Sequence, residues 1–404
     1  MYINRYLEGT VTNLSKSFKI LYIAGPRQVG KTTMLSRLAE KEGMAYASMD
    51  DLSTRNIANE DPELFLQRYP PPVLIDEVQY TPGLFPYMKI LSDASNKRGL
   101  FWMTGSQHFT MMKNVRESLA GRVAIIDMLG FSSAEEQGLE QAAEAFVPGL
   151  EYVDAEHQDI NAVFRRIHRG CFPVMTHSDP PPHDVFYNSY IQTYIDRDLR
   201  DIFNISKIAE FNKFLRICAA RTGQVLNYSN LANDSGVSVH AAREWINILV
   251  AGYQIFLLHP YHSNISKRMI KAPKMYFLDT GLAAFLTRWS TVETLMNGAM
   301  AGAFFETYVV GEIIRSYWHR GRPAPVYYFR DKEGHEIDLL IDTDSVLYPV
   351  EIKLGAKIDR HDVKHINYLR KIHKSTGRGA VISLASEKKP VDRDNDNVPV
   401  HLIR

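Results

Sequence analysis

Cysteine is scarce in this chain of 404 residues, so the composition argues first against disulfide bonds. The two cysteines, Cys171 and Cys218, stand far apart in the sequence. So few thiols argue against a disulfide framework or a cysteine metal site, and their scarcity suits a reducing compartment. We therefore expect a cytoplasmic protein.

Long apolar runs and an excess of charge are missing as well. The most apolar stretch, residues 245–258, is interrupted by polar residues and falls short of the roughly 20 residues that a membrane-spanning helix needs. The amino terminus is too polar for a signal peptide. Because 47 basic residues nearly balance 46 acidic ones, any nucleic-acid surface must be a local patch. We expect no membrane partner, and two or three domains of about 150 residues each.

A phosphate-binding motif stands near the start of the chain. Residues 25–32, Gly-Pro-Arg-Gln-Val-Gly-Lys-Thr, fit the G-x-x-x-x-G-K-[ST] pattern without a mismatch. The apolar run before the motif predicts a buried strand, and residues 32–41 predict a helix. Gly25 and Gly30 allow backbone N–H groups to turn toward phosphate oxygens, and the helix adds its positive end. The motif predicts that Lys31 reaches the β- and γ-phosphates and that Thr32 ligates Mg²⁺.

An apolar strand that ends in two acids follows at residues 72–79. Alone, this pattern is common where a strand enters a polar loop, but after a phosphate loop it indicates a Walker B element. Ligands bind at the carboxyl ends of parallel strands. We expect Asp76 to hold Mg²⁺, directly or through water, and Glu77 to orient and deprotonate the water that attacks the γ-phosphate.

Two further groups are candidates for the same site. A strand at residues 99–103 ends in polar residues, where AAA+-type ATPases keep a sensor, and Ser106 or Gln107 could contact the γ-phosphate; a capped loop is the alternative. Arg122 is a candidate arginine finger for a neighbouring subunit, in which case the protein is a homo-oligomer, or a surface arginine paired with Glu117. The predicted nucleotide-binding residues are Gly25, Pro26, Arg27, Gln28, Val29, Gly30, Lys31, Thr32, Thr33, Asp76 and Ser106.

The middle of the chain is predicted to be helical. An acidic stretch at residues 131–156 indicates a solvated helical connection, and residues 187–203 predict a charged helix. Arg197 and Arg200 on that helix either reach the nucleotide from a lid or form exposed salt bridges.

A winged helix is predicted next. Residues 211–221 form a first helix, and residues 228–249 read as helix, turn and helix, with Gly236 in the turn. Two wing strands at residues 253–258 and 275–278 flank a basic loop. The second helix of such a module can enter a DNA major groove, but it carries few basic residues, so a protein-packing role stays open. The residues expected to face inward are Val239, Trp245, Ile246 and Leu249.

The last part of the chain predicts a hairpin that carries acidic residues. Strands at residues 336–341 and 347–354 turn at 344–345, after an amphipathic helix at residues 303–314. Period-two alternation places Asp338, Glu351 and Lys353 on the face away from the core, with Asp338 opposite Glu351. The residues expected in the core are Ile337, Leu339, Val350, Ile352 and Leu354.

Two facing carboxylates beside a lysine are the arrangement of a PD-(D/E)xK nuclease. Asp338 and Glu351 would hold Mg²⁺, and Lys353 would stabilise or position the attacking hydroxide. Glu306 on the preceding helix could add a further acid. A surface ladder of salt bridges is the alternative. A locally basic helix at residues 360–374 could follow a phosphate backbone or could simply be solvated.

Taken together, these segments resemble a widespread prokaryotic family, in which an AAA+-like P-loop ATPase domain is joined to a C-terminal domain of unknown function. The resemblance implies ATP binding, a winged helix and a restriction-endonuclease-like end domain, but it implies no biological role. The matching segments are residues 25–33, 74–79, 104–107, 118–122, 194–198, 274–281, 336–338 and 350–353.

We therefore predict an α/β protein. A P-loop NTPase domain with a parallel sheet is followed by a helical and winged-helix middle and by an α/β restriction-endonuclease-like end domain. The predicted function is ATP hydrolysis coupled to action on DNA, with ATP and Mg²⁺ as cofactors. A nucleotide-dependent switch or scaffold whose end domain does not cleave is the main alternative, and a metabolite kinase is the third. The predicted boundaries are residues 1–130, 131–205, 206–290 and 295–404.

Overall fold

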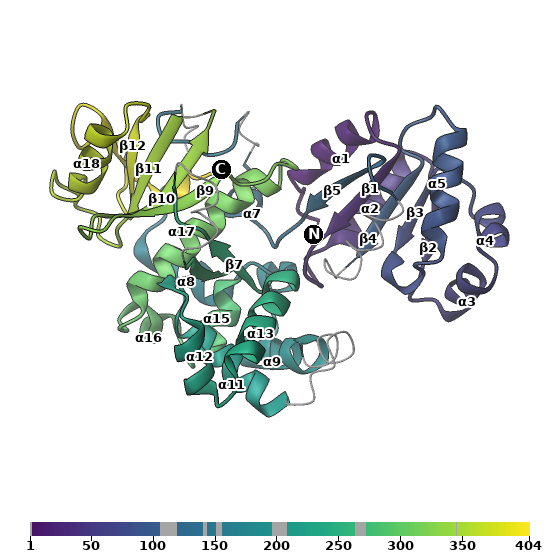
Figure 1. The fold of residues 1–404 in the computed structure, drawn as a ribbon, viewed down its shortest axis with the longest axis horizontal. Helices are drawn as coiled ribbons and strands as arrows, with labels where there is room; N and C mark the ends of the chain where they lie inside the picture. The colour runs from purple at the N-terminus through teal and green to yellow at the C-terminus, as the bar shows by residue number, and fades with distance from the viewer. Residues whose placement is uncertain are drawn as a thin grey trace. The chain divides into compact units, whose positions relative to one another are not determined.

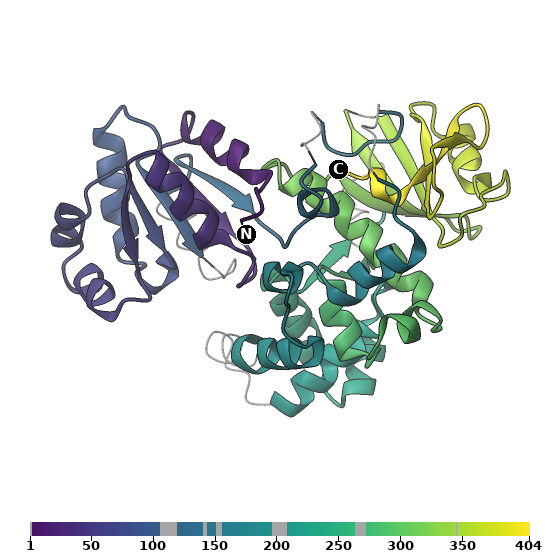
Figure 2. The ribbon, with the colours of Figure 1, turned by 180° about the vertical axis from the view of Figure 1, so that it is seen from behind.

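The computed structural model describes seven segments of the chain, namely residues 2–105, 119–139, 144–150, 156–195, 208–262, 272–344 and 346–404. The chain divides into two compact units (Figures 1 and 2). The first consists of residues 1–131 together with the short segments 251–253 and 318–322. The second holds the remainder of the chain. Among the described helices, none combines the length and the apolar character needed to cross a membrane.

A five-stranded parallel sheet forms the first unit, which confirms the predicted parallel architecture. The strand order is β2-β3-β4-β1-β5. Three neighbouring strands, β1, β3 and β4, are buried along their whole length, as expected for parallel strands that are covered on both faces. The strands are β1 Ile20–Ala24, β2 Ala45–Ser48, β3 Val73–Asp76, β4 Phe101–Gly105 and β5 Val123–Asp127.

Helices connect β1 to β2, β2 to β3 and β3 to β4. Strand β4 lies between the strand of the phosphate loop and the strand of the acidic pair. This strand continues to Gly105, two residues beyond the predicted end. The carboxyl ends of β1, β4 and β3 therefore meet side by side at one edge of the sheet. The helices are α1 Leu7–Ser15, α2 Lys31–Lys41, α3 Leu52–Glu60, α4 Pro62–Arg68 and α5 Leu84–Ala94, with a 3₁₀ turn η1 at Val78–Tyr80.

Helices and a small sheet make up the first half of the second unit. The sheet is antiparallel, with the order β6-β8-β7. Its strands are β6 Gln224–Val225, β7 Ile255–Leu258 and β8 Lys274–Phe277. The helical segments are α7 Ser133–Glu136, α8 Ile160–Arg169, η2 Pro173–Thr176, α9 His183–Tyr190, η3 Ile191–Ile195, α11 Ile208–Ala219, α12 Tyr228–Ser235, α13 Val239–Ala251, α15 Thr280–Leu286 and α16 Val292–Met296.

Two sequence-based expectations fail in this half. The stretch at residues 131–156 is not a continuous helix: within its described residues only α7 is helical. The reason lies in its backbone, because Gly138 and Gly149 both adopt left-handed conformations and Pro148 lacks an N–H group. Val239 was expected to face inward but is 40% exposed, since it begins α13; the other three predicted residues are buried.

The predicted helix-turn-helix is confirmed in its local geometry. Gly236 ends α12 with φ +78°, a left-handed conformation that glycine adopts without a steric penalty. The Ser238 side chain accepts a hydrogen bond from the backbone N–H of Ala241 at 3.1 Å, as an N-cap residue does at the start of a helix. The charged helix predicted at 187–203 begins earlier, as α9, and Arg197 and Arg200 lie outside the described residues.

A six-stranded mixed sheet of order β13-β14-β12-β11-β10-β9 forms the second half of this unit. Helix α18 packs on the sheet through Leu369 and Ile366, and it lies beside β11 and β12 in Figure 1. The elements are α17 Ala301–Trp318, β9 Val326–Arg330, β10 Glu336–Thr343, β11 Val346–Ile352, α18 Lys364–Ile372, β12 Gly379–Ser383, β13 Lys389–Pro390, β14 Asn395–Pro399 and the 3₁₀ turn η4 Val400–Leu402.

The register of the β10–β11 hairpin agrees with the prediction. Leu339 pairs with Val350 and Thr343 with Val346, so continuing the same register by one residue places Asp338 opposite Glu351. The predicted core residues Ile337, Leu339, Val350 and Ile352 are buried, but strict alternation is wrong, because Leu340 on the opposite face is fully buried as well. Both faces of the hairpin are covered, and the acidic side chains therefore lie in a partly enclosed space. Leu354, placed in the core by the alternation, lies beyond the end of β11 and is only half-buried.

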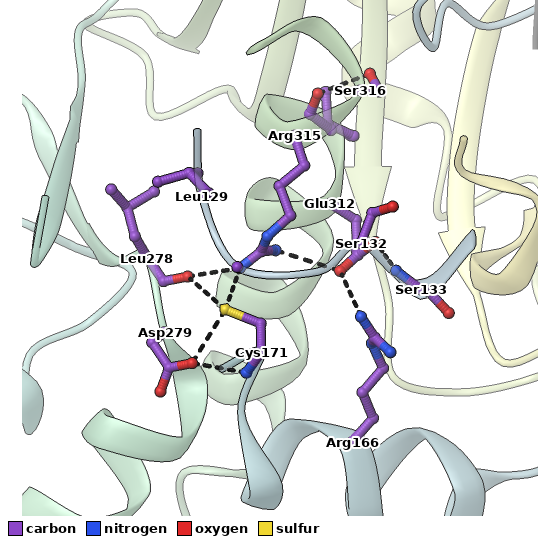
Figure 3. A network of polar contacts seen from close by, with 12 residues as sticks. Leu129, Ser132, Ser133, Arg166, Cys171, Leu278, Asp279, Glu312, Arg315 and Ser316 are labelled. Carbon is purple, nitrogen blue, oxygen red and sulfur yellow. Dashed lines mark hydrogen bonds and ion pairs between the residues drawn. The ribbon is translucent and has the colours of Figure 1, made fainter. Parts of the chain in front are cut away.

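Helix α17 is buried around most of its circumference rather than amphipathic, and its polar residues are held by a network (Figure 3). Arg315 contacts Glu312 at 3.2 Å and donates hydrogen bonds to the Leu278 carbonyl at 2.7 Å and to Cys171 Sγ at 3.1 Å. Arg166 of α8 lies 3.7 Å from Glu312 and also pairs with Glu136. Buried charges require such partners, because an unpaired ion costs several kcal/mol to remove from water.

Candidate functional site

The phosphate loop connects β1 to α2 through several unusual backbone conformations. Gly25 has φ +151°, and a Cβ atom there would lie 2.0 Å from the Met128 carbonyl oxygen, so only glycine fits. Gly30 precedes α2 with φ +90°. The buried Arg5 guanidinium donates a hydrogen bond to the Val29 carbonyl at 3.0 Å and thereby holds the loop from behind.

Lys31 begins α2 and turns its ammonium group into the loop. Nζ donates hydrogen bonds to the Gly25 carbonyl at 2.8 Å and the Pro26 carbonyl at 2.7 Å. Burial lowers the pKa of Lys31 to about 8, and the carboxylates of Glu77 and Asp76 oppose this shift. To hold a phosphate, the ammonium group would exchange its two carbonyl partners for phosphate oxygens.

Asp76 ends β3 and is the centre of the polar contacts at the carboxyl edge of the sheet. Its Oδ1 accepts hydrogen bonds from Thr32 Oγ1 at 2.8 Å and from Thr104 Oγ1 at 2.5 Å. The Tyr46 hydroxyl donates to Oδ2 at 3.4 Å. The structure therefore brings together the two predicted Mg²⁺ ligands, Thr32 and Asp76.

Glu77 follows in a left-handed conformation with φ +55°, which is uncommon for a residue other than glycine. Its backbone N–H donates to Thr104 Oγ1 at 2.9 Å, and its carboxylate accepts a hydrogen bond from Gln79. Strained backbone of this kind is often found at functional sites, where neighbouring contacts maintain it. Glu77 thus stands at the predicted position beside Asp76.

Thr104 is a residue that the sequence did not single out. It is fully buried, and its hydroxyl contacts both acidic residues of the Walker B element. The sequence placed the sensor at Ser106 or Gln107, and both lie outside the described residues. The available signal was the polar residue at the end of a strand expected beside Walker B, but that strand was predicted to stop at residue 103, whereas β4 continues through Thr104 to Gly105.

Of the remaining predicted loop residues, Thr33 lies within α2 and Val29 is buried. Arg27 Nη2 donates to the Tyr80 hydroxyl at 3.1 Å. The hydroxyl oxygen of Thr32 and the carboxylate oxygens of Asp76 are ligand atoms that Mg²⁺ prefers, so this pair fits the metal that the motif implies.

Arg122 is not brought to the phosphate loop of its own unit. It stands immediately before β5, at the amino end of the sheet, where its carbonyl accepts a hydrogen bond from the Ile20 N–H group. Its guanidinium pairs with both carboxylate oxygens of Asp93, at 2.7 and 2.9 Å. The predicted alternative partner, Glu117, lies outside the described residues. Arg122 and Asp93 line a cleft of about 420 Å³.

A second cluster of charged side chains lies in the second unit. Asp338 of β10 accepts a hydrogen bond from the backbone N–H of Ile352 at 2.9 Å. Lys353 Nζ lies 3.0 Å from Glu351 and 3.9 Å from Asp338. The predicted acid–acid–lysine constellation is therefore assembled, and Glu306 of α17 contributes to the same group through Lys274 of β8.

Burial changes the ionisation of this cluster. Glu351 is only 3% exposed, and its Oε1 atom has no hydrogen-bond partner within the described part of the chain. Burial and the nearby Asp338 raise the pKa of Glu351 to about 8. The same two causes raise the pKa of Glu306 to about 7, and Lys274 opposes that shift. A buried carboxylate oxygen without a donor suits a cation ligand, so the predicted Mg²⁺ ligands fit an ion here.

Asp331, Glu333 and His335 form a further group whose ligand atoms lie within 4.8 Å of one another. The group is partly exposed in the turn between β9 and β10, and the ring of His335 stacks on Tyr368 with centroids 3.8 Å apart. Asp331 accepts a hydrogen bond from the His335 ring, so the group is held by contacts among its own members.

Comparison with known families matches three successive parts of the chain. Residues 17–136 match the model of an AAA domain. Residues 160–293 match a domain of unknown function (DUF8612), and residues 301–403 match a second domain of unknown function (DUF4143). Uncharacterized proteins of Mycobacterium bovis and Mycobacterium tuberculosis are each 27% identical over 336 residues, which is 83% of this chain and 70% of each relative.

Solved structures show partial similarity. The Walker-type ATPase of Pyrococcus abyssi has a TM-score of 0.44 and 12% identity over 70% of this chain and 96% of its own. The RuvB Holliday junction branch migration motor of Thermotoga maritima has a TM-score of 0.29 and 16% identity over 62% and 85%. The family match and the site geometry confirm an AAA+-like P-loop ATPase domain at the amino-terminal end of the chain. The winged-helix and nuclease-like assignments stay predictions.

Proposed function

We propose that this chain is a Mg²⁺-dependent ATPase whose nucleotide state controls a DNA-binding or nuclease-like C-terminal domain. The observation that carries the ATPase is the Asp76 carboxylate, which accepts hydrogen bonds from Thr32 beside the phosphate loop and Thr104 of β4. Loop amides and Lys31 would hold the phosphates, and Glu77 would take the proton of the attacking water. Thr32 and Asp76 would hold Mg²⁺, which neutralises developing phosphate charge when bound.

The ATPase is tested by comparing two substitutions with matched controls. We expect Lys31→Ala to weaken ATP binding, whereas Glu77→Gln retains binding but hydrolyses ATP roughly 100-fold more slowly or worse. The matched controls are Lys41→Ala, at the exposed end of the same helix, and Glu60→Gln, at the exposed end of α3. Phosphate release and binding of a fluorescent ATP analogue separate the two effects. Full hydrolysis by Glu77→Gln would remove that residue from catalysis.

The order of elements supports a winged helix in the second unit. A helix, a strand, two helices and two strands follow one another as α11, β6, α12, α13, β7 and β8, and the three strands form one antiparallel sheet. His240 and Arg243 are exposed on α13, where a DNA groove could meet them. This proposal predicts DNA retention that weakens with salt, because phosphate contacts release counterions.

The charged cluster of the end domain supports a nuclease-like site. Asp338 and Glu351 lie on neighbouring strands beside Lys353, and the burial of Glu351 argues against a ladder on the protein surface. A second function, a switch that does not cleave, is favoured by one observation: Lys274 already neutralises part of the same cluster.

Cleavage of labelled branched, single-stranded and duplex DNA with Mg²⁺ or Mn²⁺ distinguishes these functions. Cleavage that Lys353→Ala abolishes would establish an ATP-linked nuclease, and Lys31→Ala would show whether ATP controls it. DNA retention that responds to ATP, without cleavage, would favour a binding domain. The absence of both would leave the nucleotide-dependent switch.

A further inference from the structure

Lys274 enters the carboxylate cluster from a different part of the chain. It is the first residue of β8, where it pairs with Leu258 of β7 and Val225 of β6. Its Nζ atom lies 2.7 Å from Glu336, 3.6 Å from Glu306 and 3.9 Å from Asp338. Only 5% of the residue is exposed. The ammonium group is therefore a buried cation with three carboxylates around it.

The same strand contributes a second contact to the cluster. Tyr276, two residues along β8 on the same face as Lys274, donates its hydroxyl hydrogen to Glu306 Oε1 at 2.6 Å. The cluster is thus built from β8, α17, β10 and β11, which come from two separately matched family regions. Lys274 belongs to the first of these regions and all four acids to the second.

Charge is not balanced in this space. Four carboxyl groups face three cations, namely the ammonium groups of Lys274 and Lys353 and the more exposed Arg330 guanidinium, which lies 3.7 Å from Glu336. Among the described residues, no donor group gives a hydrogen bond to the buried Glu351 Oε1 atom, so this oxygen is available to a cation.

We propose that the Lys274 ammonium group and a divalent cation compete for Glu306 and Asp338, so that Lys274 controls loading of the nuclease-like site. The proposal rests on the ion site of the proposed function and adds the residue that regulates it. A cation at Asp338 and Glu351 is repelled by Lys274 at its observed position, and it binds more tightly once that ammonium group withdraws. Binding and displacement are linked, so an effector that withdraws Lys274 and thereby raises cation affinity must itself bind more tightly, by the same factor, when the cation is present.

The test measures Mn²⁺ binding to the full chain by electron paramagnetic resonance, without any cleavage assay. Lys274→Met removes the charge and keeps the length of the side chain. We expect at least a tenfold gain in Mn²⁺ affinity, an order-of-magnitude effect of removing one nearby like charge. Lys332→Met, an exposed lysine in the neighbouring turn, is the matched control and should bind as the wild type does. Adding Asp338→Asn to Lys274→Met should remove the gain.

Several results would overturn the competition. They are unchanged or weaker binding by Lys274→Met, a gain that survives Asp338→Asn, or no Mn²⁺ binding by any variant. If wild type and Lys274→Met bind Mn²⁺ equally at a site that Asp338→Asn abolishes, the nuclease-like proposal stands and only the competition fails. ATP hydrolysis, measured on the same preparations, tests the proposed ATPase site of the first unit independently of the cation site.

A measurement on the wild-type protein tests the displacement of Lys274 even if the Lys274→Met variant fails to fold. Acetic anhydride acylates exposed amines, and mass spectrometry reports the modification of each lysine. We expect Mn²⁺ to increase acylation of Lys274 severalfold, because the displaced ammonium group becomes accessible, while Lys332 is unaffected. Equal acylation of Lys274 with and without Mn²⁺ would contradict the displacement.

Discussion

Replacing Thr104 by valine removes one hydroxyl group and almost nothing else. The two side chains have nearly the same shape, and the site is fully buried, so packing within β4 is preserved. Two hydrogen bonds are lost: the one that Thr104 donates to Asp76 and the one that it accepts from the Glu77 N–H group. Both residues of the Walker B element lose a fixed partner together.

The magnitude follows from those two contacts. A hydrogen bond to a charged group contributes about 1.5–3 kcal/mol, and the bond to Asp76 is of this kind. If the loss is expressed in the transition state, hydrolysis slows by roughly 10- to 100-fold, because 1.4 kcal/mol corresponds to a factor of ten. The Glu77 amide also loses the Thr104 hydroxyl as an acceptor, which weakens the left-handed turn that places its carboxylate.

Two assays on Thr104→Val check this reasoning. Steady-state phosphate release should fall by the factor above, and hydrogen–deuterium exchange should show faster exchange at the Glu77 amide. Thr81→Val is the matched control: Thr81 is also fully buried in the first unit, but its hydroxyl donates only to the Val78 carbonyl, at 3.3 Å. ATP hydrolysis by Thr104→Val at the wild-type rate, or an equal loss of rate in Thr81→Val, would refute a specific role for Thr104.

Three further predictions concern other parts of the chain. Arg315→Met should destabilise the second unit by about 3–5 kcal/mol in urea denaturation, because the buried Glu312 carboxylate loses its nearer cation and the Leu278 carbonyl loses a donor. Burial, with the neighbouring His168, lowers the pKa of His183 to about 4, below the value near 6.5 of an unfolded chain. The neutral ring therefore supports the fold above pH 6.5, and that support is lost as the pH falls toward 4. His183→Phe should reduce the acid-induced loss of stability by about 1–2 kcal/mol, allowing for solvent screening. A pH profile of thermal unfolding that is the same in the variant and the wild type would contradict this. Arg122→Ala should lower ATP hydrolysis at least tenfold if the arginine finger operates between subunits, whereas Arg98→Ala in the same cleft should not; equal activity of the two variants would assign Arg122 to its ion pair alone.

The sequence predicted the ATPase unit well because its signals are local. A glycine loop between an apolar run and a helix has few alternative structures. An apolar strand that ends in Asp76 is best accommodated as a buried strand of a parallel sheet, with the acid at its carboxyl end. The hairpin register was also predictable, since the turn at residues 344–345 determines which residues face each other. What the sequence missed there was burial, because helices and neighbouring strands that cover a hairpin are distant in the chain.

Lys274 illustrates the limit most clearly. The sequence assigned Lys274 to the basic loop before the second wing strand, whereas it is the first residue of β8, and no local signal indicates that its ammonium group meets Glu306, Glu336 and Asp338. Thr104 was missed for a smaller reason, a strand end misplaced by one or two residues. Helix α17 was read as amphipathic because its charged residues were assumed to be solvated, whereas Glu312 and Arg315 satisfy each other inside the unit.

The contribution of β8 to the acidic cluster bears on how the end domain can be studied by itself. A fragment that begins near residue 295 follows the natural family boundary, yet it leaves behind Lys274 and Tyr276, two of the groups that contact Glu306. Such a fragment would carry its acids without their internal counterion. Its affinity for divalent ions would overstate that of the intact protein, and an activity found in the fragment would describe a released form of the domain.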